Sequence, residues 1–337
     1  MENFVSIIAA VIAFVVTAAL GKVLIPWLHK LKYGQPIKEI GPTWHSAKSG
    51  TPTMGGLTFL AGVGIAVCVC LPLYWSAAAE PVSTERCVMM WAGLIMGVLY
   101  GIVGFADDYL KVVRHNNDGL SFWQKIISQT GIAAAYLAAM WISGDNGKGA
   151  TTIPFVEGQV ELGFWFYIIA LVMIVGFVNA VNLTDGIDGL CGSVTFFAAV
   201  SFMFSAALVQ ILEISIIGAA LAGGCLGFLV WNFYPAKVFM GDTGSLFLGG
   251  MFCALAFGMD MPILIPLVGI IYLCEAGSVI IQRYYFKLTH GKRIFKMSPI
   301  HHHFEMCGWS EIKIVTVFSI VTFIAGIVTA LLVGFGS

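Results

Sequence analysis

The sequence predicts an all-α polytopic integral membrane protein: one bundle of about ten transmembrane helices, a single domain over residues 1–337, with a small external β-hairpin. The first observation is composition, because 59% of the residues are hydrophobic and only 10% are charged, against about 25% charged in soluble domains. The second is a series of apolar segments about 20 residues long, as a transmembrane helix needs. The third is the gathering of lysine and arginine on alternate loops. Together they exclude a soluble globular domain and a disordered chain.

Ten segments are long and apolar enough to be transmembrane helices. The expected spans are residues 3–25, 54–75, 87–106, 126–143, 163–181, 190–210, 213–231, 245–260, 262–282 and 312–335. The seventh and eighth give the weakest signal, because they are short and rich in glycine. No basic stretch precedes the first apolar run, which argues against a cleaved signal peptide.

The basic residues predict the orientation of these spans. One set of alternate loops carries Lys22, Lys30, Lys32, Lys38, Lys48, Lys111, Arg114, Lys125, Lys237, Arg283, Lys287, Lys292, Arg293, Lys296 and Lys313. The other set carries only Arg86 and Lys148. Because the side rich in lysine and arginine is normally cytoplasmic, the first set is expected inside the cell. An even number of spans then places both termini outside. The net charge of −1 gives no sign of nucleic-acid binding.

One external loop has a recognisable pattern. Residues 151–162 (TTIPFVEGQVEL) alternate between apolar and polar on both sides of Glu157-Gly158. This pattern predicts a small β-hairpin.

The first chemically distinctive cluster follows the third expected span. Asp107 and Asp108 are adjacent carboxylates at a helix end, and Lys111 lies one turn further along. Like charges so close to a membrane need compensation by a divalent cation, by Lys111, or by both. A solvated helix end is the alternative interpretation.

The second cluster lies between the fifth and sixth spans, in residues 179–189 (NAVNLTDGIDG). Asp185 and Asp188 are three residues apart and share a face if the segment is helical. Asn182 or Thr184 could cap the next helix, and the glycines let backbone amides approach a ligand. A capped helix start explains only part of this set, which favours a functional site.

The third cluster, residues 232–245, precedes the eighth span and includes Asn232, Phe239 and Asp242. Its end, GDTGS, opens a helix, where free N–H groups favour a phosphate. Asp242 would repel that phosphate unless a cation such as Mg²⁺ joined the two. A simple helix cap is an equally good interpretation of this motif taken alone.

The fourth cluster runs from Gln282 to Glu311 and contains a basic run followed by His301, His302 and His303. No cysteine or further histidine has the spacing of a zinc site, so zinc is disfavoured. The basic run fits either the positive-inside pattern or a patch for anionic lipid headgroups. The histidines beside it could bind phosphate or act as acids and bases.

Four further polar residues begin spans or lie within them. Residues 48–56 (KSGTPTMGG) offer Lys48 and Thr53 as contacts for phosphate or carbonyl oxygens. Lys125 enters the fourth span, where it could equally be a membrane-boundary anchor. Glu275 lies inside the ninth span, where a carboxylate is either functional or bonded within the helix packing.

All of the strong clusters are predicted to share the cytoplasmic face. Transporters usually place ionisable groups and broken helices near the bilayer midplane. Acids at helix ends instead suit a site where a water-soluble reactant meets a lipid-borne one. The pattern therefore favours an interfacial transferase over a transporter or flippase.

The same motifs resemble those of the polyprenyl-phosphate N-acetylhexosamine-1-phosphate transferases. The matching segments, in the order in which the family has them, are 48–56 (KSGTPTMGG), 107–111 (DDYLK), 182–189 (NLTDGIDG), 239–245 (FMGDTGS) and 299–309 (PIHHHFEMCGW). The PIHHHFE stretch is similar to the muramoyl branch of the family. Relatives that use UDP-GlcNAc are the main alternative.

The resemblance implies transfer of phospho-MurNAc-pentapeptide from UDP-MurNAc-pentapeptide to undecaprenyl phosphate, giving lipid I and UMP. It implies a Mg²⁺-dependent cytoplasmic site in the bacterial inner membrane, a homodimer, and inhibition by nucleoside antibiotics. This reaction is the first membrane step of peptidoglycan synthesis.

The resemblance also implies roles for individual residues. Asp242 would bind Mg²⁺, and Asp107 with Asp108 would serve the lipid phosphate nucleophile. Nucleotide or sugar contacts would come from Lys48, Thr53, Asn182, Asp185, Asp188, Asn232, Phe239 and Gln282, with Phe239 stacking on uracil. His301 and His302 would face the diphosphate or the inhibitor groove, and His303 is included among the substrate-binding candidates. Lys111 and Lys125 would lie between the two anions, as phosphoryl transfer requires. Direct transfer and a route through a phospho-aspartate both stay open.

Overall fold

The structure is a computed structural model that describes residues 2–30, 48, 50–77, 82–114, 119–144 and 149–336. Lys32, Lys38 and Lys148, which entered the orientation argument, lie outside the described residues. The elements are α1 (Glu2–Lys30), α2 (Gly56–Ala77), α3 (Thr84–Val113), α4 (Phe122–Ser143), β1 (Ala150–Thr152), β2 (Gln159–Glu161), α5 (Phe164–Thr184), α6 (Leu190–Leu208), α7 (Leu212–Asn232), α8 (Gly241–Gly258), α9 (Leu264–Val268), α10 (Ile270–Leu288), α11 (Ile300–Met306) and α12 (Glu311–Gly336). The all-α polytopic fold predicted from the sequence is confirmed.

Each of the ten expected spans corresponds to a helix or, for the ninth, to the pair α9 and α10. Among the described residues, eight helices are long and apolar enough to cross a membrane, namely α1 to α7 and α12. Helix α8 begins with the polar residues Asp242, Thr243 and Ser245, and α10 ends with Gln282, Arg283 and Lys287. These polar ends lower their hydropathy, and their crossing of the bilayer stays a prediction.

Helix α8 lies in the interior of the bundle. Every residue from Thr243 to Phe257 is buried, which matches a helix that is apolar on all sides. Its first turn approaches α3 very closely, because a Cβ on Gly104 would lie 2.1 Å from the backbone oxygen of Asp242. Only glycine allows this approach, and it brings the start of α8 next to the acidic end of α3.

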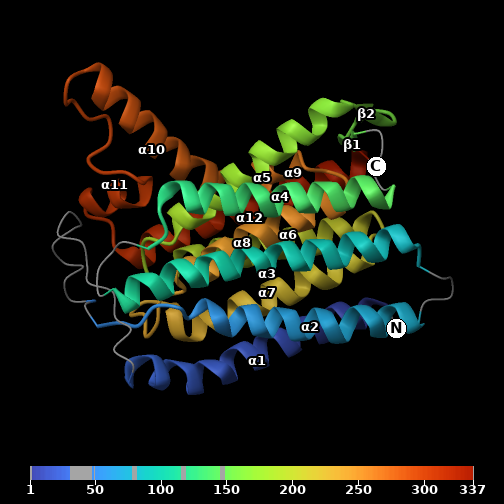
Figure 1. Cartoon of the computed structure of the whole chain (residues 1–337), viewed down its shortest axis with the longest axis horizontal. Coiled ribbons are helices and arrows are strands. Elements are labelled where there is room, and N and C mark those ends of the chain that lie inside the picture. Colours follow the sequence, from blue (N-terminus) through green and yellow to red (C-terminus); the bar gives the residue numbers. More distant parts are fainter. Residues whose placement is uncertain are drawn as a thin grey trace.

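Both chain ends and the β-hairpin lie at one end of the bundle, and α11 lies at the other (Figure 1). A backbone hydrogen bond of 3.2 Å from Phe155 in the hairpin to Gly336 joins two of these parts directly. The two termini therefore share one side, as expected for an even number of spans.

The predicted β-hairpin is confirmed, with a wider loop than its sequence suggests, and its position outside the membrane stays a prediction. Strands β1 and β2 are antiparallel, and Thr152 pairs with Gln159. The connection is therefore residues 153–158 rather than a tight turn at Glu157-Gly158. Asp260, which follows α8, fastens the hairpin: one carboxylate oxygen accepts hydrogen bonds from Thr152 Oγ1 at 3.1 Å and Gln159 Nε2 at 2.7 Å.

We expect Asp260→Ala to loosen the hairpin without affecting chemistry at the far end of the bundle. Two hydrogen bonds to a charged group are lost, which corresponds to about 1–3 kcal/mol for a partly exposed site. The measurement is thermal unfolding and protease cleavage of the purified protein in detergent. Cleavage after β1 should become faster, whereas turnover should stay within about twofold of wild type. Unchanged cleavage would contradict the fastening role.

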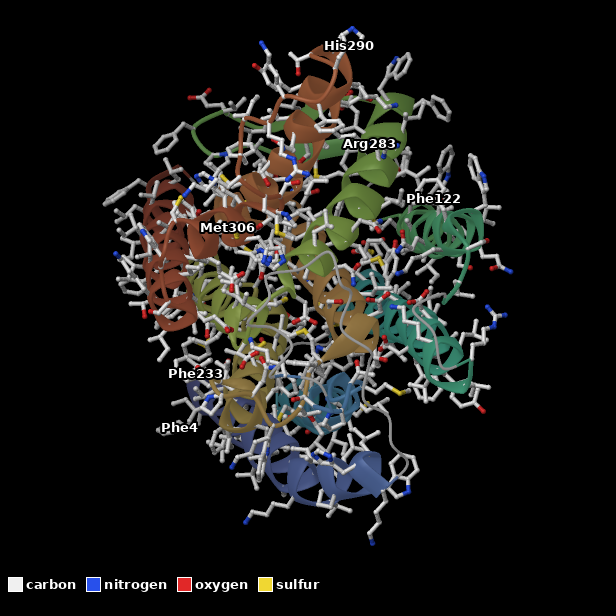
Figure 2. All side chains as sticks on the ribbon, turned by 90° about the vertical axis from the view of Figure 1, so that its left-hand side faces the viewer. Phe4, Phe122, Phe233, Arg283, His290 and Met306 are labelled. Atoms are coloured by element: carbon white, nitrogen blue, oxygen red, sulfur yellow. The ribbon has the colours of Figure 1, made fainter. Side chains whose placement is uncertain are left out.

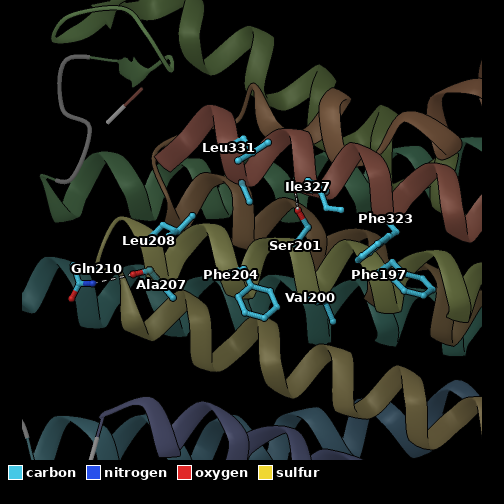
Figure 3. A pocket seen from close by; sticks show the side chains of 12 residues that line it. Phe197, Val200, Ser201, Phe204, Ala207, Leu208, Gln210, Phe323, Ile327 and Leu331 are labelled. Atoms are coloured by element: carbon cyan, nitrogen blue, oxygen red, sulfur yellow. Dashed lines mark hydrogen bonds between the residues drawn. The ribbon is translucent and has the colours of Figure 1, made fainter. Parts of the chain in front are cut away.

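A cavity of about 570 Å³ lies between α6 and α12 (Figure 3). Its lining is mostly apolar, including Phe197, Phe204 and Phe323. The hydroxyl of Ser201 donates a hydrogen bond of 3.3 Å to the backbone oxygen of Gly326 across it. Several lining side chains are also exposed on the outer surface of the bundle, so the cavity opens toward the space that lipid would occupy.

Candidate active site

Three acids that are far apart in the sequence meet at the end of the bundle opposite the termini. Asp107 and Asp108 come from the end of α3, and Asp242 comes from the first turn of α8. One carboxylate oxygen from each lies within 4.8 Å of the others. Figure 2 looks onto this end of the bundle, with Phe122, Phe233 and Met306 around it. Of the five acids that the sequence motifs predict to share one pocket (Asp107, Asp108, Asp185, Asp188 and Asp242), the structure brings these three within ligand distance of one another.

Asp108 accepts hydrogen bonds from the start of α8 and also lies 3.9 Å from Lys111 Nζ. Its Oδ1 accepts the backbone N–H of Asp242 at 3.1 Å, and its Oδ2 accepts the N–H and hydroxyl of Thr243 at 2.9 and 2.7 Å. Its side chain is fully buried. Free N–H groups at a helix N-terminus favour a negative charge. Asp108 thus fixes the first turn of α8 against α3.

Asp107 and Asp242 share two lysines. Lys111 Nζ lies 2.6 Å from Asp107 Oδ2 and 3.3 Å from Asp242 Oδ2. Lys125 forms an ion pair with Asp242 and lies 3.7 Å from Asp107 Oδ2. The predicted compensating charge is therefore present, and Lys125 is part of the cluster rather than a membrane anchor alone.

Asn182, at the end of α5, completes the surroundings of Asp242. Its Nδ2 donates to Asp242 Oδ1 at 2.9 Å and to the Ser245 hydroxyl at 2.8 Å. One oxygen of Asp242 is thus held by an amide and the other by lysine. Behind it, Asn179 donates a 2.7 Å hydrogen bond to Gln129 on α4, which ties α5 to the helix that carries Lys125.

Asp185 lies between α5 and α6, outside the membrane-spanning helices. Burial, and then the charges of Asp242 and Asp108, raise its pKa to about 8. At pH 7 most of this carboxyl group is therefore protonated and able to donate a hydrogen bond. Asp185 therefore lies close enough to the acidic cluster to be affected by its charge.

Lys48 connects Asp188 with a residue that the sequence did not single out. Its Nζ lies 2.7 Å from Asp188 Oδ1 and 2.6 Å from Oε2 of Glu311, the first residue of α12. The same glutamate oxygen accepts the backbone N–H of Asp188 at 3.0 Å. Glu311 follows the histidine motif by only a few residues, but nothing in its sequence pattern separates it from an ordinary acidic helix start.

Asn232 and Phe239 border the same loop. Asn232 accepts the N–H of Gly189 at 3.1 Å and donates to the carbonyl of Val238 at 2.9 Å. The backbone of Phe239 pairs with Pro52 at 2.8 Å and with Gly55 at 2.9 Å. Its half-buried ring belongs to the segment that joins α7 to α8.

Thr53 lies at the acids themselves. It is buried, and its hydroxyl has no hydrogen-bond partner among the described residues. A Cβ on Gly241 would lie 2.7 Å from that hydroxyl and 2.4 Å from Asp108 Oδ2. The Thr53 hydroxyl is therefore next to the acidic cluster.

The fourth motif is arranged around the acids rather than among them. Gln282 accepts the N–H groups of Ile294 and Phe295 at 3.1 and 3.0 Å, so it braces the loop before α11. His302 pairs with Glu305 at 2.6 Å. His303 Nδ1 accepts the N–H of Lys296 at 3.1 Å.

His301 is fully buried and pairs with Glu275 of α10, with Nδ1 3.0 Å from a carboxylate oxygen. Its direct catalytic role stays a prediction.

The donor set fits a magnesium ion. Carboxylate oxygens are the ligands that Mg²⁺ prefers, usually one or two from the protein. Asp107, Asp108 and Asp242 each offer one carboxylate oxygen within 4.8 Å of the others, and the Asp108 side chain is the most deeply buried of the three, which favours Asp107 and Asp242 as the ligands. The lysines beside them would stay available for phosphate.

The comparisons with known proteins agree with this site. The model for glycosyl transferase family 4 matches residues 90–260, which include all three acids. The model described as phospho-N-acetylmuramoyl-pentapeptide-transferase signature 1 matches residues 48–60, which include Lys48 and Thr53. The bundle with its acidic end is thus a membrane-embedded transferase of glycosyl transferase family 4.

Proteins named phospho-N-acetylmuramoyl-pentapeptide-transferase are similar over nearly the whole chain. That of Clostridium botulinum (strain Eklund 17B / Type B) is 45% identical, with 95% of this chain and 94% of the relative covered. That of Desulfitobacterium hafniense is 42% identical, with 95% of each covered. That of Listeria monocytogenes serotype 4b is 41% identical, with 99% of this chain and 100% of the relative covered. The chain belongs to the phospho-N-acetylmuramoyl-pentapeptide-transferase family.

Proposed function

We propose that this protein transfers phospho-MurNAc-pentapeptide from UDP-MurNAc-pentapeptide to undecaprenyl phosphate in a Mg²⁺-dependent reaction. An oxygen of the lipid phosphate forms a bond with the phosphorus that carries the sugar. The bond from that phosphorus to the bridging oxygen breaks, and UMP leaves with the electron pair. The products are lipid I and UMP, so the reaction is the first membrane step of peptidoglycan synthesis.

The observation that carries this proposal is the pairing of two acids with two lysines at the end of the bundle. Phosphoryl transfer depends chiefly on positioning and on neutralising charge. Mg²⁺ bound by Asp107 and Asp242 would supply positive charge to the diphosphate. Lys111 and Lys125, each close to Asp242, supply further positive charge where the two anions must approach each other.

The lipid phosphate requires no strong base. The second pKa of a phosphate monoester is about 6, so it is mostly ionised at neutral pH. Asp107, held by Leu120 N–H at 2.8 Å and by Lys111, is therefore proposed to orient the nucleophile or the metal. Asp108 supports this geometry by fixing the start of α8.

The nucleotide is proposed to bind over the loop between α5 and α6. Lys48 and Asp188 pair at 2.7 Å, and Asn232 holds Gly189, so the loop has a defined shape. Asp185 supplies a proton donor at neutral pH, and the ring of Phe239 offers a face on which uracil can stack. Thr53, Asn182 and Gln282 would contact or brace the sugar and diphosphate, with His302 and His303 at the rim.

The proposal also covers location and partners. The site faces the cytoplasm and both termini lie outside the inner membrane, because the basic residues fall on the loops at the site end. A homodimer is proposed, and nucleoside antibiotics are proposed as inhibitors that occupy the nucleotide site.

The test is the reaction of the purified protein in detergent with polyprenyl phosphate and Mg²⁺. UDP-MurNAc-pentapeptide and UDP-GlcNAc are supplied separately, and the lipid product and UMP are identified by mass spectrometry. We expect lipid I and UMP from the first substrate only. A product from UDP-GlcNAc would assign the chain to the related activity, and no UMP from either would contradict a transferase.

Removal of divalent cations is expected to abolish turnover. Without Mg²⁺ the diphosphate faces the buried acids with only the two lysines as counter-charge, so we expect a loss of about a thousandfold or more. The assay compares EDTA-treated protein with the same sample after Mg²⁺ is restored. The thermal unfolding temperature of both samples is the control for loss of fold. Full activity in EDTA would contradict the metal dependence.

A further inference from the structure

The buried pair formed by Glu275 and His301 lies directly behind the loop proposed to bind the nucleotide. Both side chains are fully buried. Glu275 Oε2 lies 3.0 Å from His301 Nδ1 and also accepts the backbone N–H of His301 at 3.5 Å. One carboxylate oxygen therefore holds both the ring and the backbone of the first turn of α11. Such a contact to Nδ1 fixes which ring nitrogen is left for other use.

The other ring nitrogen points at the nucleotide loop. His301 Nε2 is buried and has no hydrogen-bond partner among the described residues. A Cβ on Gly186 would lie 2.2 Å from it, so the ring rests against the backbone of Gly186. That glycine stands between Asp185 and Asp188 and is exposed on its other side.

We propose that Glu275 is a positioning residue that acts through His301 to hold the turn at Gly186 in the form that binds the nucleotide part of the substrate. Glu275 itself touches neither substrate nor metal. The ring is the spacer between α10 and the loop, and only glycine leaves room for it. This role rests on the proposed function, because it assigns the loop to the nucleotide and not to the lipid phosphate.

The role predicts that changes at Glu275 act on one kinetic parameter. In Glu275→Ala the ring loses its fixed orientation, and the KM for UDP-MurNAc-pentapeptide should rise about tenfold. The kcat and the KM for undecaprenyl phosphate should change by less than about threefold, because the acids and lysines are untouched. Glu275→Gln keeps an oxygen that can accept the Nδ1 proton and should restore most of the nucleotide KM.

The decisive measurement is a double-mutant cycle on the full-length protein in detergent. If Glu275 acts through His301, the nucleotide KM of the double variant Glu275→Ala, His301→Ala should equal that of His301→Ala alone. Additive effects would overturn the proposal, as would a loss confined to kcat. Glu213→Ala is the matched control, since Glu213 is a buried glutamate at the opposite end of α7 from Asn232. An equal rise in nucleotide KM in this control would also overturn it.

If Glu275→Ala does not fold, a second double-mutant cycle tests the contact between His301 and Gly186. Gly186→Ala places a methyl group against Nε2 and should raise the nucleotide KM. Adding His301→Ala should remove the part of the rise that the methyl group causes, because the methyl group then has room, so that the double variant has the KM of His301→Ala alone. No relief would overturn the proposal. Wild-type UMP release is measured first: its absence would remove the proposed function, whereas normal release with additive cycles would remove only the positioning role.

Discussion

Asp242→Asn is expected to reduce kcat by about a thousandfold or more while the protein still inserts and folds. The substitution removes the negative charge that Lys111, Lys125 and Asn182 converge on. Removing one such preorganised electrostatic group typically costs two to three orders of magnitude, and loss of a metal ligand adds to it. UMP release under saturating substrates and Mg²⁺ is the measurement.

Asp260→Asn provides the control for Asp242→Asn. It makes the same acid-to-amide change at the other end of α8, where the Asp260 carboxylate accepts hydrogen bonds from the hairpin residues Thr152 and Gln159. Its turnover should match wild type within about twofold. If Asp242→Asn retained turnover within tenfold of wild type, the acidic cluster would not be the reaction site.

The fold was largely predictable because the bilayer restricts it. A chain in hydrocarbon must satisfy its backbone hydrogen bonds internally, so long apolar segments become helices. The basic residues on alternate loops then predict which side of the membrane each loop faces. The span that became α8 gave a weaker signal because it is short and rich in glycine, and α9 with α10 is broken at Gly269.

The meeting of the acids could be predicted only in part. The sequence places Asp107 and Asp242 at helix ends on one face, and their proximity follows from the close approach of α3 to α8 at Gly104. That approach depends on helix packing, which no local pattern encodes. Glu311 was missed for the same reason, because its contacts with Lys48 and Asp188 come from elements far away in the sequence.

The histidine motif shows a further limit of local patterns. Three successive histidines suggest a shared task, yet their rings have three different partners: Glu275, Glu305 and the backbone of Lys296. On a helix, successive residues point about 100° apart, so neighbours in sequence face different surroundings. The buried His301 is therefore distinguished from His302 and His303 by its partner and not by the sequence motif.

Substitution of the adjacent acids Asp107 and Asp108 is expected to lower turnover in both cases but stability only for Asp108. Asp108→Ala leaves two backbone N–H groups and the Thr243 hydroxyl without their acceptor inside the bundle. Each buried group left unpaired costs about 1–3 kcal/mol. The apparent unfolding temperature in detergent should therefore fall by about 5–10 °C, together with turnover. The unfolding temperature of Asp108→Asn should fall similarly, because an amide side chain accepts hydrogen bonds only through its oxygen and not through its NH₂ group.

Asp107→Ala is the matched variant, because it removes an acid of the same type from the next position in the chain. Asp107 accepts one backbone N–H, from Leu120, and pairs with Lys111, which keeps Asp242 as a partner. Its unfolding temperature should stay within about 2 °C of wild type, while turnover falls by about a hundredfold or more. Thr243→Val removes only one of the bonds to Asp108 and should show an intermediate loss of stability, which would attribute the Asp108 effect to the start of α8. We propose that Asp108 holds the start of α8 and that Asp107 acts in the reaction. Equal losses of stability in Asp107→Ala and Asp108→Ala would contradict this division of roles.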